Sequence, residues 1–140
     1  MLKYIGMLGM FLFVMSCKSK ENKVQDLHTE VMEIHDEVMP KMTNLHSSRK
    51  ELEIALKQGA DSIKVFELLE KVDAADEAMM VWMDEFDMPD STVDEAIVLD
   101  YLQAEKVRIL KVKTDIESCV GSVSEFAAKY ITTSLDSLRQ

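Results

Sequence analysis

Cysteine, glycine, proline and aromatic residues are all scarce in this chain, and each shortage excludes something. Its 140 residues include 2 Cys, 4 Gly, 2 Pro and 1 Trp. Two cysteines are too few for a disulfide framework, a four-ligand zinc finger or an iron–sulfur site. Basic residues are outnumbered, giving a net charge of -10, which argues against a nucleic-acid partner because phosphate binding needs a basic face. With 47% hydrophobic and 30% charged residues, the chain fits one folded domain.

Long hydrophobic runs are also missing, and the longest one lies at the very start. The apolar run from Tyr4 to Met15 is much shorter than the roughly 20 residues that a membrane-spanning helix needs. Lys3 precedes it and the small Ser16 follows it, which is typical of a secretory signal peptide. We therefore interpret residues 1–16 as a signal peptide.

The residue after this run is Cys17, and the sequence Val14-Met15-Ser16-Cys17 resembles the lipobox of bacterial lipoproteins. The resemblance implies cleavage before Cys17 and a diacylglycerol on its thiol, carrying acyl chains such as palmitate. A plain signal peptide with a coincidental cysteine is the alternative. By analogy with lipoprotein sorting, Lys18 favours an outer-membrane lipoprotein that faces the periplasm. Residues 17–23 are then the lipidated cysteine and a tether, and 24–140 form the domain.

The periodicity of that domain predicts an all-α fold. Apolar residues recur at helical spacing throughout, and no segment alternates with a period of two between turn signals. We expect helices over about 24–58 and 62–86, and a third helix that starts at Ser91 or Thr92, where Asp94 and Glu95 complete a capping pattern. Short loops make neighbouring helices antiparallel, which predicts an up-down-up three-helix bundle with long, coiled-coil-like helices.

Four residues decide where these helices end or bend. Gly59 suits the end of the first helix, and Asp61 suits the N-cap of the second. Pro40 is expected to kink the first helix without ending it. Gly121 either ends the third helix before a short fourth one or lies within one long helix, and the unbroken apolar stripe favours the long helix.

Methionine is the one residue in excess, with 11 in the chain. The seven that follow the signal peptide lie between positions 32 and 88, and all three histidines lie in the first helix. The three histidines and the three methionines of the first helix form one row at alternating spacings of four and three: His28, Met32, His35, Met39, Met42 and His46. A turn centred near residue 60 places positions 79–83 of the second helix opposite 39–42.

This His/Met row has two explanations. Methionine fills irregular cores, and a methionine stripe usually does only that, which needs no cofactor. Thioether and imidazole groups also suit Cu(I). The candidate copper ligands are His35, Met39, Met42, His46, Met79 and Met83. Haem is a weaker option, since no C-x-x-C-H motif is present.

Two carboxylates interrupt the apolar stripes of the second and third helices. If the second turn is tight, position 104 lies level with position 74, and His46, Asp76 and Glu105 share one layer. A buried carboxylate is costly unless it is paired, and histidine is a natural partner. The layer is either a polar device that fixes the register of the helices or a site for a divalent ion.

Two segments, MEIHDEVMPKM (32–42) and DEAMMVWMDEF (76–86), followed by YLQAEK (101–106), resemble a known group of small bacterial lipoproteins. These lipoproteins carry the label "viral A-type inclusion protein", which automatic transfer attaches to helical, coiled-coil-like sequences. The resemblance covers roughly residues 28–120. The family has no established activity, so the resemblance implies location and fold, not chemistry.

The sequence does not predict an enzyme. It contains no phosphate-binding glycine loop, no G-x-S-x-G and no H-E-x-x-H, and Cys119 is expected to be a buried free thiol. The expected role is that of a lipid-anchored structural or protein-interaction protein, with an envelope metal-binding protein as the alternative. The tight second turn leaves the third helix without a facing partner beyond about residue 117. Its apolar stripe there predicts a homo-oligomer or protein contact, through Val123, Phe126, Tyr130, Ile131 and Leu135.

Overall fold

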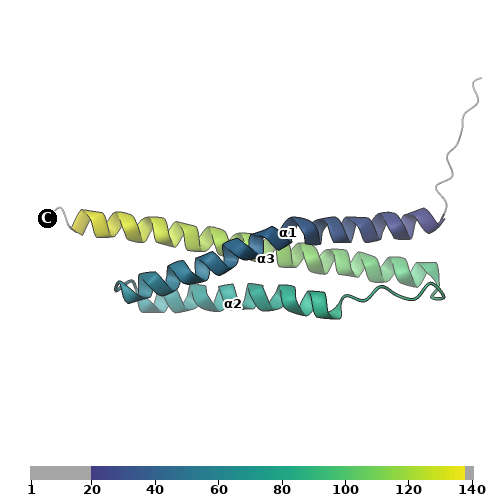
Figure 1. Ribbon diagram of the computed structural model, residues 1–140, viewed down its shortest axis with the longest axis horizontal. Coiled ribbons are helices and arrows are strands. Elements are labelled where there is room, and N and C mark those ends of the chain that lie inside the picture. The colour runs from purple at the N-terminus through teal and green to yellow at the C-terminus, as the bar shows by residue number, and fades with distance from the viewer. Residues whose placement is uncertain (1–19, 138–140) are drawn as a thin grey trace, which may run out of the picture.

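The computed structural model describes residues 20–137, with side chains described over 23–130. It contains three helices that pack against one another: α1 (Lys20–Lys57), α2 (Ser62–Glu85) and α3 (Glu95–Ser137) (Figure 1). No strand occurs between residues 20 and 137. The all-α prediction is confirmed. The predicted signal peptide and Cys17 lie outside the described residues, and α1 begins at Lys20, within the segment expected to be a tether.

The core follows a heptad pattern in each helix. In α3 the buried positions alternate at spacings of three and four, and α2 shows the same pattern. Along α1, the residues spaced by seven are almost fully buried. The buried sets are Val31, Val38, Leu45 and Leu52 in α1, then Val65, Leu68, Val72, Ala75, Met79 and Trp82 in α2, and Leu102, Glu105, Ile109, Val112, Ile116, Cys119 and Val123 in α3. A repeat of seven keeps the same faces in contact along long helices, which explains how they share one narrow core.

The turn between α1 and α2 forms as local sequence signals predict. Gly59 has φ 86°, a left-handed conformation that glycine adopts without strain. Its N–H donates to Leu56 O at 3.1 Å, and the N–H of Ala60 donates to Ala55 O at 3.0 Å, which closes the end of α1 as a Schellman motif. The side chain of Asp61 then caps α2 by accepting from the N–H of Ile63 at 3.0 Å. The predicted roles of Gly59 and Asp61 are confirmed.

The connection between α2 and α3 differs from the tight turn that the sequence suggested. The segment 86–94 runs on beyond the end of α2 before the chain turns back into α3 (Figure 1). Asp90 closes the turn itself, with Oδ1 accepting from Thr92 N at 2.9 Å, and this bond lowers the pKa of Asp90. The helix cap is Asp94, whose Oδ1 accepts from Ala96 N at 2.9 Å. The predicted start of α3 at Ser91 or Thr92 is therefore wrong.

Ion pairs between α1 and α3 reveal the relative direction and register of these two helices. Lys106 reaches Glu30 at 2.6 Å and Lys113 reaches Glu37 at 2.6 Å, while Lys41 pairs with Glu117. Every pair joins residues 76 positions apart. Two helices that run in the same direction give such a constant offset, so α1 and α3 lie parallel (Figure 1).

The other two seams are antiparallel. Between α1 and α2, His46 meets Asp76 and Arg49 meets Asp73, which agrees with a turn centred near residue 60. Between α2 and α3, Arg108 pairs with Glu85. A tight turn would have put residue 85 level with about residue 93. The extended connection shifts α3 by about 15 residues, or roughly 22 Å, from the position that the sequence suggested.

This shift gives the C-terminal part of α3 a partner within the chain. Cys119 and Val123 are buried, while Phe126 and Tyr130 pack against the core. Tyr130 also donates its hydroxyl to Gln58 O at 2.9 Å, at the end of α1. The expectation of an unpaired α3 beyond residue 117 is therefore wrong for these residues. The side chains of Ile131 and Leu135 lie outside the described range.

Pro40 and Gly121 were the two positions at which a helix could bend or end, and neither of them ends its helix. Pro40 lies inside α1, and the helix continues through it, changing direction about halfway along (Figure 1). Gly121 lies inside α3, which continues unbroken to Ser137, so the prediction of one long helix is confirmed. Among the described residues, none of the helices is both long and apolar enough to cross a membrane.

Candidate functional site

The strongest concentration of predicted site residues lies along the seam between α1 and α2. His46 Nε2 lies 2.9 Å from Asp76 Oδ1, so the two residues meet as the sequence predicted. They do not lie in the core, however, since the His46 side chain is 58% exposed and the Asp76 side chain 37%. The contact is a surface hydrogen bond at the edge of the seam.

Glu105, the third member of the predicted polar layer, lies elsewhere. Its side chain is only 5% exposed, and Oε1 accepts from Arg108 Nη1 at 2.9 Å. Arg108 also pairs with Glu85, and the hydrogen bond that Arg108 donates to Glu105 is the main reason why the pKa of Arg108 is raised. Because Arg108 pairs with Glu85, Glu105 is level with about residue 88 of the connection, roughly 18 Å along the axis from Asp76. The predicted layer of three is therefore wrong, and its cause is the extended connection.

A row of stacked rings occupies the same level of the bundle as Glu105. Phe86 is central, with its ring centroid 6.1 Å from His28, 5.0 Å from Trp82 and 6.2 Å from Tyr101. Trp82 in turn stacks on His35 at 5.6 Å. The Tyr101 hydroxyl accepts from Asp87 N at 2.9 Å, which ties the connection to α3. Two of the three histidines are therefore packed against aromatic rings.

Two buried polar atoms at this level have no hydrogen-bond partner among the described residues: Trp82 Nε1 and Glu105 Oε2. Such atoms are costly in a protein interior. His35 is better satisfied, because its Nδ1 lies 3.0 Å from Asp36 Oδ1. The carboxylate accepts this bond, which places the proton of neutral His35 on Nδ1 and leaves Nε2 with its lone pair.

The predicted copper ligands divide between core and surface. Met42 and Met79 are buried, while Met39 is 38% exposed and Met83 is half-buried. Met80, which is not among the six candidate copper ligands, is 54% exposed and follows Asp76 by four residues on the same face of α2. The surface set, which we call the His/Met strip, consists of His28, Met32, His35, Met39 and His46 on α1 with Met80 and Met83 on α2.

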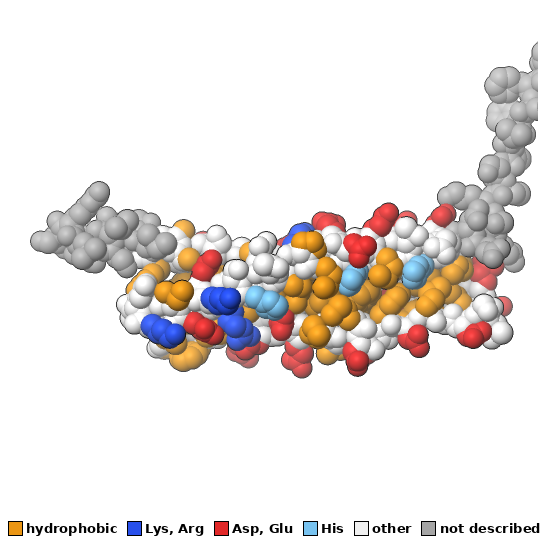
Figure 2. Space-filling view, in the orientation of Figure 1, with side chains coloured by type: hydrophobic (Ala, Val, Ile, Leu, Met, Phe, Trp, Pro, Cys, Tyr) orange, Lys and Arg blue, Asp and Glu red, His pale blue; other side chains and the backbone are white. Residues whose placement is uncertain are grey.

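Figure 2 shows the histidines along this face, with hydrophobic side chains gathered beside them. The exposed thioethers make the strip a soft, apolar surface that can adapt to another apolar surface. As a metal site it offers only methionine and single histidines. Within the described part of the chain, no three His, Cys, Asp or Glu side chains are grouped closely enough to hold a metal ion.

Cys119 has the environment that the sequence predicted. It is a free, buried cysteine. Burial raises the pKa of its thiol, and the nearby charge of Lys71 only partly opposes that effect. A protonated, buried thiol is a weak nucleophile.

A cleft that the sequence did not predict lies between α2 and α3. It consists of one cavity of about 570 Å³ and a second of about 240 Å³, and Lys71 and Ser122 line both. The residues that line it were visible in the sequence, but the tight-turn register placed the two helices too far apart along their axes to bring them together. The length of the connection between α2 and α3, which no local signal specifies, decided this.

Comparisons with protein-family models, with curated proteins and with solved structures found no match. The resemblance to the small lipoproteins labelled "viral A-type inclusion protein" therefore stays a prediction, carried only by the segments that suggested it.

Proposed function

We propose that this chain is a lipid-anchored protein of the bacterial cell envelope with a structural or protein-interaction role and no enzymatic activity. The lipobox-like sequence that ends at Cys17 supports the anchor, and Lys18 supports an outer-membrane position facing the periplasm. The offset of 76 residues in the ion pairs between α1 and α3 supports an up-down-up bundle. The buried, protonated thiol of Cys119 speaks against nucleophilic chemistry there.

The observation that carries the interaction role is the His/Met strip. Met39 and Met80 are both large, apolar and well exposed, and they lie on facing helices. Surfaces of this kind commonly mark interaction sites, since a solvated face would normally carry polar side chains. The strip replaces the C-terminal half of α3 as the candidate contact surface. The apolar stripe of α3 is covered by the chain's own helices over residues 119–130.

The anchor is tested by metabolic labelling with an alkyne analogue of palmitate in a bacterium that expresses the full chain. The wild-type protein should take up the label and sediment with the membrane fraction, and Cys17→Ser should lose both properties. Cys119→Ser is the matched control and should keep both. Labelling that survives Cys17→Ser would contradict a lipid at this position.

The interaction role is tested by placing a photo-crosslinking amino acid at Met39 or Met80 in the full chain. Both positions should give the same discrete adduct in the cell, and Met83→Glu should remove it from both. Val107, which is 61% exposed on α3, serves as an equally apolar control outside the strip. Identical adducts at all three positions, or none at Met39 and Met80, would contradict a specific contact at the strip.

The second candidate function is binding of Cu(I), and it has one specific observation in its favour. The hydrogen bond from His35 to Asp36 leaves His35 Nε2 as the available nitrogen, as in many histidines that bind metals. Met39 follows His35 by one turn, and Met83 lies on the facing helix. In contrast, the bond between His46 and Asp76 occupies Nε2 of His46.

A titration of the full chain with Cu(I) against a competing chelator distinguishes this candidate from the first. Specific binding should raise the melting temperature by mass action, and a variant with Met39→Leu and Met83→Leu should lose that rise. Met88→Leu changes a methionine outside the strip and should have no effect. If the chain does not compete with the chelator, or if all variants behave alike, the copper site is wrong.

A further inference from the structure

The cleft between α2 and α3 is not part of the His/Met strip and has a different chemistry. It is open because short side chains face each other across the seam: Ala74 and Ala75 on α2, and Ser118 and Ser122 on α3. The Ser122 hydroxyl is turned back onto its own helix, donating to Ser118 O at 2.8 Å. At 1.5 Å per residue, the stretch of α3 from Ser118 to Tyr130 measures about 18 Å.

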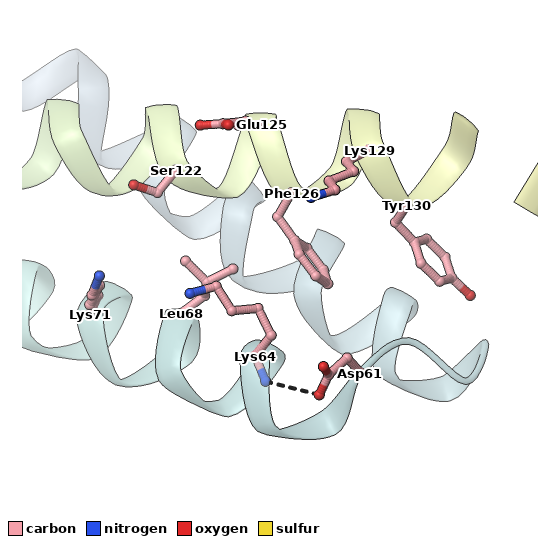
Figure 3. A pocket seen from close by; sticks show the side chains of 9 residues that line it. All are labelled: Asp61, Lys64, Leu68, Lys71, Ser122, Glu125, Phe126, Lys129 and Tyr130. Atoms are coloured by element: carbon pink, nitrogen blue, oxygen red, sulfur yellow. Dashed lines mark hydrogen bonds between the residues drawn. The ribbon is translucent and has the colours of Figure 1, made fainter. Parts of the chain in front are cut away.

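The floor of the cleft is apolar. Leu68 and Cys119 are almost fully buried beneath it, and Figure 3 shows the Phe126 ring directed from α3 toward α2. The Tyr130 hydroxyl is already bonded to Gln58 O, so this side chain offers mainly its ring to the cleft. Burial keeps the pKa of Cys119 raised, and its thiol is therefore a neutral part of the floor.

The rim of the larger cavity carries positive charge. Lys64, Lys71 and Lys129 line it, in a chain whose net charge is -10. Lys64 pairs with Glu67 at 3.0 Å, whereas Lys71 forms no ion pair with any described residue. The close-up in Figure 3 shows these lysines on both sides of the apolar floor.

Three carboxylates also face the cleft, and two of them are occupied. Asp61 accepts the N–H groups that begin α2, at 3.0 and 3.3 Å. Asp115, in the smaller cavity, pairs with Lys111 at 2.5 Å. Glu125 is left on the rim of the larger cavity. Two charged side chains of the cleft therefore form no ion pair with a described residue: Glu125 on the rim of the larger cavity, and Lys71 where the two cavities meet.

We propose that this cleft binds a free single-chain amphiphile with an anionic headgroup, either a carboxylate or a phosphate. The apolar chain lies along the floor between Leu68 and Phe126, and the headgroup interacts with Lys71 and the neighbouring lysines of the rim. The combined volume of the two cavities is in the range of small-molecule sites. Charge complementarity selects the anion, and the apolar floor selects the chain.

The test is calorimetric titration of the full chain carrying Cys17→Ser, which leaves Cys119 as the single thiol. The probes are dodecanoate and dodecyl phosphate below their critical micelle concentrations. Both should bind at one site and shift the backbone amide resonances of residues 64–75 and 115–130. Inorganic phosphate and the neutral dodecyl maltoside should each bind at least tenfold more weakly.

Variants locate the binding. Ser122→Trp fills the cleft and should abolish binding, while Ser124→Trp, an exposed neighbour outside the cleft, should not. Lys71→Met should weaken binding about tenfold, the cost of one charge-assisted hydrogen bond, and Lys50→Met on α1 should leave it unchanged. Ala74→Glu adds a negative charge at an exposed position and should also weaken binding, which keeps the test open if Ser122→Trp does not fold.

Three results would overturn the proposal. If dodecyl maltoside binds as tightly as the anionic probes, the lysines do not recognise a headgroup. If inorganic phosphate binds as tightly as dodecyl phosphate, the cleft binds an anion without using the apolar floor. Binding to vesicles of anionic phospholipid without binding to monomeric dodecanoate would show that the face contacts membranes. None of these outcomes depends on the lipid anchor or on the His/Met strip, so the proposal stands or fails separately from the proposed function.

Discussion

Ion pairs cross the seam between α1 and α3, which we call the closed seam, whereas a cleft lies in the seam between α2 and α3, which we call the open seam. The same buried heptad positions of α3 face both neighbouring helices. Long Lys and Glu side chains cross the first seam at Lys106–Glu30 and Lys113–Glu37. At the second seam, Ser122 lines two cavities and Ala74 lines the smaller of them. The buried stripe thus decides which helices meet, while the residues beside the stripe decide whether a site remains between them.

The largest expected effect comes from removing a core side chain beneath the closed seam. Leu45 is fully buried, and Leu45→Ala should lower the free energy of unfolding by about 2–5 kcal/mol, because both the burial of the side chain and its packing are lost. Chemical denaturation followed by circular dichroism measures the change. Ile54→Ala, at an exposed position of the same helix, is the control and should cost much less.

The next effect has the opposite sign and concerns the open seam. Ser122→Leu should raise the free energy of unfolding by about 0.5–2 kcal/mol, since the new side chain fills space next to Phe126. Ser124→Leu brings a similar gain in helix propensity at an exposed position and isolates the filling effect. If the two variants are equally stable, the cleft is not a packing defect.

Of the two glycines among the described residues, Gly59 is required by its backbone conformation and Gly121 is not. An added Cβ at Gly121 meets no atom within 4 Å, so Gly121→Ala should stabilise α3 by about 0.5–1 kcal/mol. Gly59→Ala should destabilise instead, since φ is +86° there. Thermal unfolding of the two variants should therefore shift in opposite directions, and a shift in the same direction would contradict the assignment of the turn.

The smallest effect is electrostatic and belongs to the closed seam. Hydrogen bonds from Lys113 and Lys41 lower the pKa of Glu37, so this residue contributes stability above its unfolded pKa. That contribution is lost as the pH falls through the lowered, folded pKa. Melting temperatures between pH 7 and pH 3 should fall for the wild type and fall less for Glu37→Gln. An equal fall for both proteins would show that the ion pair does not contribute.

The sequence predicts the parts of this molecule that depend on local chemistry. Gly59 and Asp61 are recognisable because a left-handed residue and a side-chain cap are needed within a few residues of each other. The register of α1 against α2 follows from that short turn, which is why His46 and Asp76 meet as expected.

The register of α3 against the other two helices depends on the length of the connection between α2 and α3, and no local sequence signal specifies that length. Nothing in the residues 86–94 specifies that they run on beyond α2, and Ser91 and Thr92 look as suitable for the helix start as Asp94, which is the actual cap. The error moved Glu105 into the wrong layer and hid the cleft. It also made Phe126, which is partly buried against the core, look unpaired.

The position of the Schellman turn at Gly59 sets how far the molecule can reach. The cleft lies beside this turn, at the far end of α1 from Lys20 (Figure 1). A helix of 38 residues is up to about 57 Å long at 1.5 Å per residue. If the chain is attached to a surface through its N-terminal side, α1 therefore holds the cleft up to this distance away from that surface.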